Sequence, residues 1–214
     1  MSKTTERTIK CSACGAEINA TIWDSINVTL SPNEKENVKN GSIFDVKCDK
    51  CSSHMFLEYQ CMYHDMDKKI VVCSLQQNQI DEAIEYMSLF AKQGYTIRFV
   101  STNNALIEKV RIFESGLKDT IIEYLKVNIA MEIDDENIIG YTYFDGISTN
   151  SNNQKQLDFV IYYNEPRHIG ILMEAYDGFV DLFPDNIADC STLDGVIVDA
   201  YSVFEWAKKN LLEE

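Results

Sequence analysis

Two C-x-x-C pairs constrain the fold of this chain more than any other feature of its sequence. The first pair is Cys11 and Cys14, the second is Cys48 and Cys51, and residues 15–47 separate them. Two residues between cysteines let a tight turn direct both thiolates of a pair at one point, and two such turns supply the four soft ligands of a tetrahedral zinc site. The spacing therefore predicts one zinc ion that joins two distant strands.

The predicted site has no open coordination position, because four thiolates complete the tetrahedron. We therefore expect one structural Zn²⁺ per chain, which contributes to folding and performs no chemistry. Two alternatives are four cysteines buried as small apolar residues, which polar neighbours such as Lys10 and Asp49 disfavour, and a redox-active pair, which would open a helix after a strand. Gly15 offers the positive φ that such a turn favours, whereas Ser52 at the matching position does not.

The first 75 residues are typical of a β unit with one helical insertion. Residues 17–30 alternate with the strand period, and residues 43–47 resemble a second strand. Between them, Ser31 suits a helix N-cap, Glu34 suits its capping-box partner, and Gly41 ends the helix. Residues 55–61 and 69–75 predict a hairpin. The expected buried face of residues 17–30 consists of Ile18, Ala20, Ile22, Ile26, Val28 and Leu30.

Beyond residue 75 the hydrophobic period becomes helical. It predicts a helix at residues 78–93 that ends at Gly94, a strand at 95–100, and two helices separated by Gly116. From residue 132 the pattern returns to strands, followed by a closing helix. The expected segments are strands at 138–144, 157–163 and 169–175, a polar hairpin tip at 148–156, and a helix at 203–212.

The acidic charge is concentrated at the C-terminal end. The chain carries a formal charge of −15, and residues 132–214 hold 4 basic against 17 acidic residues. This shift places the expected domain boundary at 131/132. We expect an α+β protein: a zinc-ribbon-like antiparallel β unit with a long insertion (residues 1–75), a mainly helical section packed with it (76–131), and an acidic C-terminal α+β part (132–214).

Composition also limits the compartment and the partners. Residues 1–10 are polar and contain no apolar signal segment, and the apolar runs are shorter than the roughly 20 residues of a membrane span. Seven cysteines, an odd number, favour a reducing compartment. We therefore expect a cytoplasmic protein that does not bind membranes. The acidic C-terminal part repels phosphate backbones and favours a protein partner with a basic surface.

Two histidines are candidates for chemistry. His64 and Asp65 stand in the predicted hairpin tip and are weak candidates for an acid–base pair. Neighbours on a strand point to opposite faces, so His64 could equally bond the backbone and hold the turn. His54 follows the second cysteine pair and could replace one cysteine as a ligand, although four cysteines already complete the site.

Several other residues suggest structural roles more readily than functional ones. Cys61 and Cys73 could face each other across the hairpin or be two separate buried thiols, and Cys190 suits the core or the surface. Residues 108–111 read as the solvated face of a helix. The acidic residues 134–136 lack the spaced oxygens and the glycine of a calcium loop and suit a solvated loop.

The chain resembles the CpXC protein family over roughly residues 5–130. The resemblance rests on both C-x-x-C pairs, on the segments 23–28 and 63–66, and on the later segment 106–119. Ser12 and Asp49 depart from the family pattern, which usually has proline after each leading cysteine. These are turn positions, so the resemblance implies the same four cysteine ligands. It implies no activity and no catalytic residue.

These features favour a non-catalytic zinc-binding interaction module, such as an adaptor or regulator. The sequence contains no phosphate-binding loop, no dinucleotide fingerprint, no H-E-x-x-H and no G-x-S-x-G. An enzyme of unknown reaction, with His64 and Asp65 in a pocket, is the first alternative. A nucleic-acid-binding zinc ribbon is the second, which the small number of basic residues disfavours.

Overall fold

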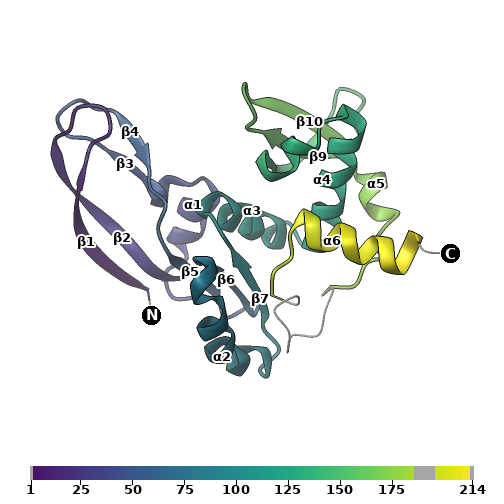
Figure 1. Ribbon diagram of the computed structural model, residues 1–214, viewed down its shortest axis with the longest axis horizontal. Coiled ribbons are helices and arrows are strands. Elements are labelled where there is room, and N and C mark those ends of the chain that lie inside the picture. The colour runs from purple at the N-terminus through teal and green to yellow at the C-terminus, as the bar shows by residue number, and fades with distance from the viewer. Residues whose placement is uncertain (1, 186–195, 213–214) are drawn as a thin grey trace. The chain divides into compact units, whose positions relative to one another are not determined.

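The computed structural model describes residues 2–185 and 196–212, and it shows an α+β protein with a mixed sheet and several helices (Figure 1). The chain forms two compact units, residues 1–107 and residues 108–214, which are described separately below. The expected domain boundary at 131/132 rested on the shift in charge and on the change of hydrophobic period, and it stays a prediction. Cys190 lies outside the described residues.

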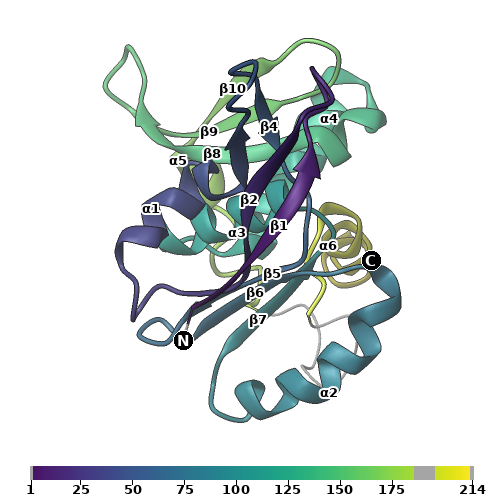
Figure 2. The same cartoon turned by 90° about the vertical axis from the view of Figure 1, so that its left-hand side faces the viewer.

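The first unit is built on a five-stranded sheet of mixed direction, with strand order β1-β2-β5-β6-β7 (Figure 2). β1 pairs with β2 and β5 with β6 in antiparallel fashion, whereas β2–β5 and β6–β7 are parallel. All five residues of β6 are buried, as expected of a central strand covered on both faces. The strands are β1 (Lys3–Lys10), β2 (Glu17–Asn27), β5 (Cys61–Asp65), β6 (Ile70–Ser74) and β7 (Thr96–Val100).

The alternation predicted for residues 17–30 is confirmed in β2. Ile18, Ala20 and Ile22 are buried, and the residues between them are exposed. The strand ends at Asn27, however, so Leu30 lies in the following turn and is 61% exposed. The predicted β face was therefore correct within the strand and wrong at its last residue.

A separate two-stranded hairpin, β3 (Asp45–Lys47) with β4 (His54–Phe56), follows the helical insertion. The insertion contains α1 (Asn33–Lys39), and Gly41 has the predicted left-handed φ of 77°. The predicted capping box does not form: Pro32 is the N-cap, and the Ser31 hydroxyl lies 3.2 Å from that of Ser2. The strand predicted at 55–61 is divided, since β4 pairs with β3 and β5 with β6.

The β5–β6 hairpin has a register one residue away from the expected one. Cys61 is paired with Ser74, and Cys73 is paired with Met62. Because successive residues of a strand point to opposite faces, the two cysteines lie on opposite faces of the sheet. Both are buried, which confirms the interpretation as two separate thiols, and the alternative that they face each other across the hairpin is wrong. After the hairpin, α2 (Ile80–Ala91) leads to β7, as predicted.

The second unit packs helices on a three-stranded antiparallel sheet of order β10-β9-β8. Its core includes Ile121, Leu125, Phe144, Phe159 and Val203, drawn from both helices and strands. The helices are α3 (Asn103–Glu114, of which residues 108–114 belong to this unit), α4 (Asp119–Ile133), α5 (Met173–Asp177) and α6 (Ala200–Ala207), and the strands are β8 (Thr142–Thr149), β9 (Lys155–Ile161) and β10 (Arg167–Leu172).

The predicted elements of this unit are present with shifted ends. A 3-10 turn (Glu136–Tyr141) occupies the start of the segment expected as a strand, so β8 begins later. β10 passes directly into α5, where a continuous strand was expected. Residues 150–154 form the tip of the β8–β9 hairpin, as predicted. Among the described residues, no helix has the length and apolar character needed to cross a bilayer.

Candidate metal centre

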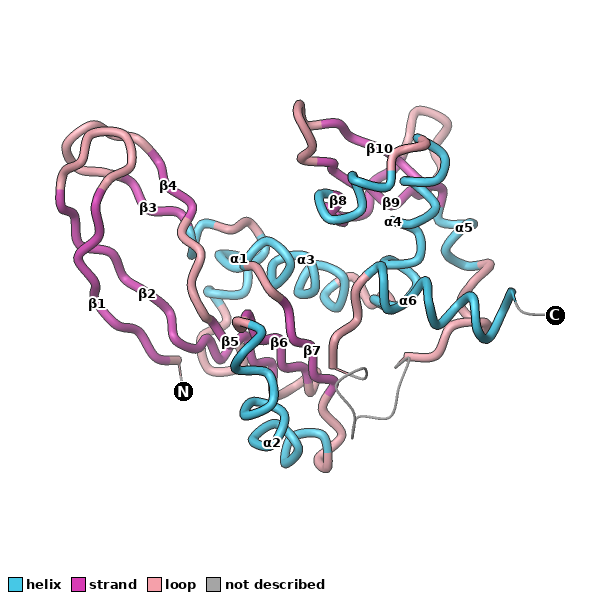
Figure 3. The backbone as a smooth tube through the Cα atoms, viewed as in Figure 1, coloured by secondary structure: helices cyan, strands magenta, loops and turns pink. Residues whose placement is uncertain are grey.

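Each C-x-x-C pair forms the turn of a β-hairpin. Cys11 and Cys14 lie in the turn between β1 and β2, and Cys48 and Cys51 lie in the turn between β3 and β4. Figure 3 shows these two loops side by side at the ends of their hairpins. The sequence predicted that the site joins two strands, and the structure shows that it joins two hairpins.

The two turns, here called knuckles, have the same backbone geometry. In each, the amide of the leading cysteine donates to the carbonyl five residues later, and the amide four residues later donates to the leading cysteine's carbonyl, all at 2.8 Å. Each knuckle contains one residue with positive φ, Gly15 at 73° and Ser52 at 59°. Sequence reasoning expected this conformation only at the glycine, but the shared hydrogen bonds impose it on Ser52 as well.

The four sulfur atoms converge as a metal site requires. All four Sγ atoms lie within 4.8 Å of one another, with 3.7 Å between Cys11 and Cys51 and 3.8 Å between Cys14 and Cys48. Zinc–sulfur bonds of about 2.3 Å in a tetrahedron place the sulfurs about 3.8 Å apart. A disulfide would need about 2.05 Å. The arrangement therefore fits a single metal ion and does not fit two disulfides.

Ser53 adds a hydroxyl beside two of the sulfurs. Its Oγ lies 2.9 Å from Cys51 Sγ and 3.3 Å from Cys11 Sγ. This contact lowers the pKa of Cys11 to about 6, and the Ser53 hydroxyl also lowers the pKa of Cys51. The Ala16 amide acts to lower the pKa of Cys14, but the neighbouring thiols outweigh it and raise that pKa to about 12. Four adjacent thiols cannot all ionise without a cation between them.

Little apolar packing supports the two knuckles. Cys11 and Cys48 are buried, while Cys14 and Cys51 are exposed, which excludes four fully buried cysteines as the explanation of the pattern. The buried pair belongs to a small cluster with Ile18 and Met55. Among the described residues, the partly buried hydrophobic side chains that pack against this cluster are Ile9, Val46 and Leu57. The ends of the hairpins therefore depend on the cysteines for cohesion.

The family model described as CpXC protein matches residues 9–126, which include all four cysteines and more than half of the chain. The chain belongs to the CpXC family. No curated protein and no solved structure matches it. CpXC membership thus agrees with the cysteine cluster as a metal site, and it brings no activity with it.

The histidine closest in sequence to the CpXC cysteines does not join them. His54 Nδ1 contacts the Asp45 carboxylate across the β3–β4 hairpin, and its side chain is 60% exposed. The cluster that can hold a metal contains the four cysteines. Among the described residues, the sequence-predicted ligand set is therefore brought together without His54.

His64 and Asp65 have different surroundings in this CpXC protein. Asp65 accepts hydrogen bonds from the amides of Asp67 and Lys68 and forms an ion pair with Lys35 at 2.9 Å. The His64 ring packs against two aromatic rings at 5.4–5.5 Å. Burial lowers its pKa, and its Nε2 is buried without a hydrogen-bond partner in the described part of the chain. Asp65 thus holds the turn in place, and both of its carboxylate oxygens already have partners within the protein.

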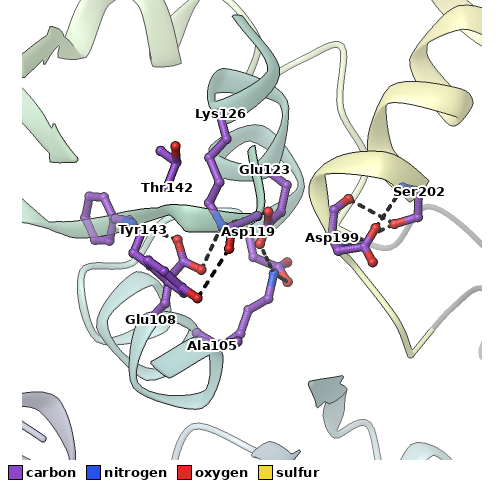
Figure 4. Close-up of polar contacts among 12 residues, drawn as sticks. Ala105, Glu108, Asp119, Glu123, Lys126, Thr142, Tyr143, Asp199 and Ser202 are labelled. Carbon is purple, nitrogen blue, oxygen red and sulfur yellow. Dashed lines mark hydrogen bonds and ion pairs between the residues drawn. The ribbon is translucent and has the colours of Figure 1, made fainter. Parts of the chain in front are cut away.

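A chain of buried charges was not predicted (Figure 4). Five residues of α3 and α4, each at most 5% exposed, are linked through their side chains by contacts of 2.7–3.0 Å. The series ends on a backbone amide of β8. The prediction that residues 108–111 form a solvated face is wrong for Glu108 and Lys109. In order, the chain runs Asp119, Lys109, Glu123, Lys126, Glu108 and the amide of Phe144.

This network of buried charges contains three carboxylates and two ammonium groups. Burial raises the pKa of Glu108, although Lys126 opposes that shift. Burial also acts on Glu123, but Lys109 and Lys126 outweigh it and lower its pKa. Such a network is enclosed, so its described contacts suit holding α3, α4 and β8 in register more than binding a substrate. The spacing of Asp119, Glu123 and Lys126 on a largely apolar helix was the available sequence signal.

Proposed function

We propose that this protein is a non-catalytic interaction module whose N-terminal hairpins are held together by one structural zinc ion. Cys11, Cys14, Cys48 and Cys51 are the proposed ligands. The observation that carries the proposal is the convergence of their sulfurs at tetrahedral spacing. A closed four-thiolate site leaves no position for a reacting molecule, so its contribution is to folding.

The charge distribution supports a protein partner with a basic surface. The net charge of −15 lies mostly in residues 132–214, and such a field attracts basic surfaces and repels phosphate backbones. We propose an adaptor or regulator that acts in the cytoplasm. The engaged oxygens of Asp65 give no specific support to an enzyme built on His64 and Asp65.

Metal analysis tests the zinc proposal directly. Protein purified from cells grown with sufficient zinc is expected to contain about one zinc ion per chain. The Cys14→Ser variant is expected to contain much less zinc. Cys73→Ala is the matched control, because Cys73 is a buried free thiol outside the cluster and its replacement should leave the zinc content unchanged. A zinc content near zero in the unmodified protein contradicts the proposal.

Affinity capture tests the interaction role. The tagged protein, mixed with cell extract at low salt, is expected to retain a basic protein that is released as salt rises, because screening weakens contacts between exposed charges. A retained partner that is acidic, or whose binding does not change with salt, contradicts the proposed surface chemistry. Recovery of the protein alone under gentle conditions contradicts the interaction role.

A further inference from the structure

A groove of about 700 Å³ lies in the second unit between the C-terminal half of α4, the 3-10 turn that follows it, and α6. Its apolar lining includes two large side chains that are mostly in water, Met131 at 67% and Tyr201 at 63% exposure. The two helices pack on each other through buried residues such as Val203, so the groove borders a fixed pair of helices. Exposed apolar side chains gathered in a groove are typical of binding surfaces.

The border of this groove is acidic. Asp134, Asp135, Glu136 and Glu205 line it, and no lysine or arginine is among the described residues that do. Asp134 and Glu136 are exposed, whereas Asp135 accepts hydrogen bonds within its own turn. The lining of the groove therefore combines apolar side chains with several carboxylates.

Lys208 shows that residues lining the groove can bind a cationic side chain. Lys208 Nζ lies 2.8 Å from Glu205 and 4.4 Å from the centre of the Phe204 ring. Glu205 and Phe204 both line the groove. Lys208 is 47% exposed, so its contacts are screened and weak, and a cation from another molecule can replace it. The same two groups would then hold a lysine or arginine by charge and by cation–π attraction.

We propose that this groove is the docking site for a basic amphipathic helix of a partner protein, which rests on the interaction function proposed above. Apolar anchors on one face of such a helix would pack on Met131 and Tyr201, and flanking basic residues would meet the carboxylates. The acidic border disfavours nucleic acids and anionic lipids. A neutral or acidic helix would lack the complementary charge.

A model peptide tests the site without knowledge of the partner. The probe is a fluorescein-labelled peptide of leucine and lysine, about 14 residues or roughly four helical turns long, with the leucines on one face. Fluorescence anisotropy is expected to show saturable binding to the full protein. A peptide of the same composition in scrambled order is expected to bind at least about tenfold more weakly, because it presents no apolar face. Equal binding of the two peptides overturns the proposal.

Two tyrosines of equal exposure provide the matched variants. Tyr201→Asp removes an apolar contact of the groove, while Tyr86→Asp makes the same change at an equally exposed site in the first unit, 63% in both cases. The added negative charge would strengthen purely electrostatic binding in both variants. We expect at least about tenfold weaker binding for Tyr201→Asp and less than twofold change for Tyr86→Asp. Equal effects of the two substitutions overturn the docking site.

The same variants separate this proposal from the interaction function. If Tyr201→Asp still captures the basic partner from cell extract, the groove is wrong and the interaction function stands. If the unmodified protein captures no partner but binds the model peptide in the groove, the interaction function fails and the docking chemistry stands. Met131→Asp is the second groove variant, should Tyr201→Asp lower the melting temperature.

Discussion

Gly15 and Ser52 occupy equivalent positions in the two knuckles, with φ of 73° and 59°, and only one of them is glycine. The left-handed conformation costs a residue with a side chain about 1 kcal/mol or more. Replacing that residue by glycine removes this strain, but it also increases the entropy of the unfolded chain, which lowers stability by a somewhat smaller amount. We therefore expect Ser52→Gly to raise the free energy of unfolding of the zinc-loaded protein by up to about 1 kcal/mol.

Gly15→Ala gives the reciprocal measurement. Apart from Gly15 itself and its two chain neighbours, no described residue has a heavy atom within 4 Å of the position that the new Cβ would occupy. The expected cost of about 1 kcal/mol is therefore conformational alone. Denaturant unfolding of both variants provides the comparison. A loss of stability in Ser52→Gly would show that the serine side chain contributes more than its backbone strain removes.

Removal of the metal is expected to loosen the hairpin ends and leave the centre of the sheet intact. The knuckles rest on a small apolar cluster, whereas every residue of β6 is buried. After chelation, hydrogen exchange should accelerate in β1–β2 and β3–β4, and the amides of β6 should remain protected. If hydrogen exchange accelerated equally in β6, zinc would stabilise the whole first unit and not the hairpin ends alone.

The thiols should divide into two reactivity classes. Burial raises the pKa of Cys73 to about 12, and it also raises the pKa of Cys61. Iodoacetamide at pH 8 should therefore leave both unmodified in the native protein, even after chelation exposes the four knuckle cysteines. Peptide mapping by mass spectrometry provides the measurement. A Cys61–Cys73 disulfide after oxidation would contradict the register that places them on opposite faces.

The buried charges should respond far more strongly to substitution than a neighbouring ion pair that is partly exposed. Lys109→Met leaves three buried carboxylates with one lysine, and we expect a loss of about 3–5 kcal/mol in the free energy of unfolding. Arg111→Met is the control, because its Asp145 partner is 44% exposed and such pairs contribute about 1 kcal/mol or less. Adding Glu123→Gln to Lys109→Met should recover part of the loss.

The Asp65 turn should make stability depend on acid pH. Burial acts to raise the pKa of Asp65, but the Lys68 amide and the Lys35 ammonium outweigh it and hold that pKa below the ordinary 3.8. Its stabilisation is therefore complete above about pH 4 and is lost as pH falls through the lowered pKa. Asp65→Asn should cost about 2 kcal/mol at pH 7 and progressively less below pH 4.

Asp67→Asn is the control for this pH dependence, because Asp67 is an exposed residue of the same turn. Thermal unfolding at a series of pH values provides the comparison. If the cost of Asp65→Asn is the same at acid and neutral pH, its role is independent of its charge.

The sequence was sufficient to predict the cluster of four cysteines, because ligand chemistry and knuckle spacing are local. Four sulfurs with the required spacing can be recognised without knowledge of the sheet. By contrast, β1 was missed because it is polar apart from Ile9 and, in the described part of the chain, pairs with β2 alone. Nothing in its pattern distinguishes it from a loop.

The remaining differences arise from tertiary contacts. The β5–β6 hairpin places Asp65 opposite Ile70, and the turn between them is held by the Lys68 amide, which donates to Asp65. Cys61 is therefore paired with Ser74, one residue beyond Cys73. The helix of residues 103–114 shows an ordinary amphipathic pattern, and only its packing on α4 reveals that Glu108 and Lys109 are buried. A helical period marks which residues share a face, but it does not show what covers a charged face.

β1 is the edge strand of its sheet, and among the described residues no strand pairs with its outward-facing backbone groups. Its four charged side chains carry both signs and are exposed to water: Lys3, Glu6, Arg7 and Lys10. A strand from another molecule would have to strip water from these charges before it could add to the sheet. The charges of this edge strand therefore oppose the edge-to-edge association of sheets from different molecules.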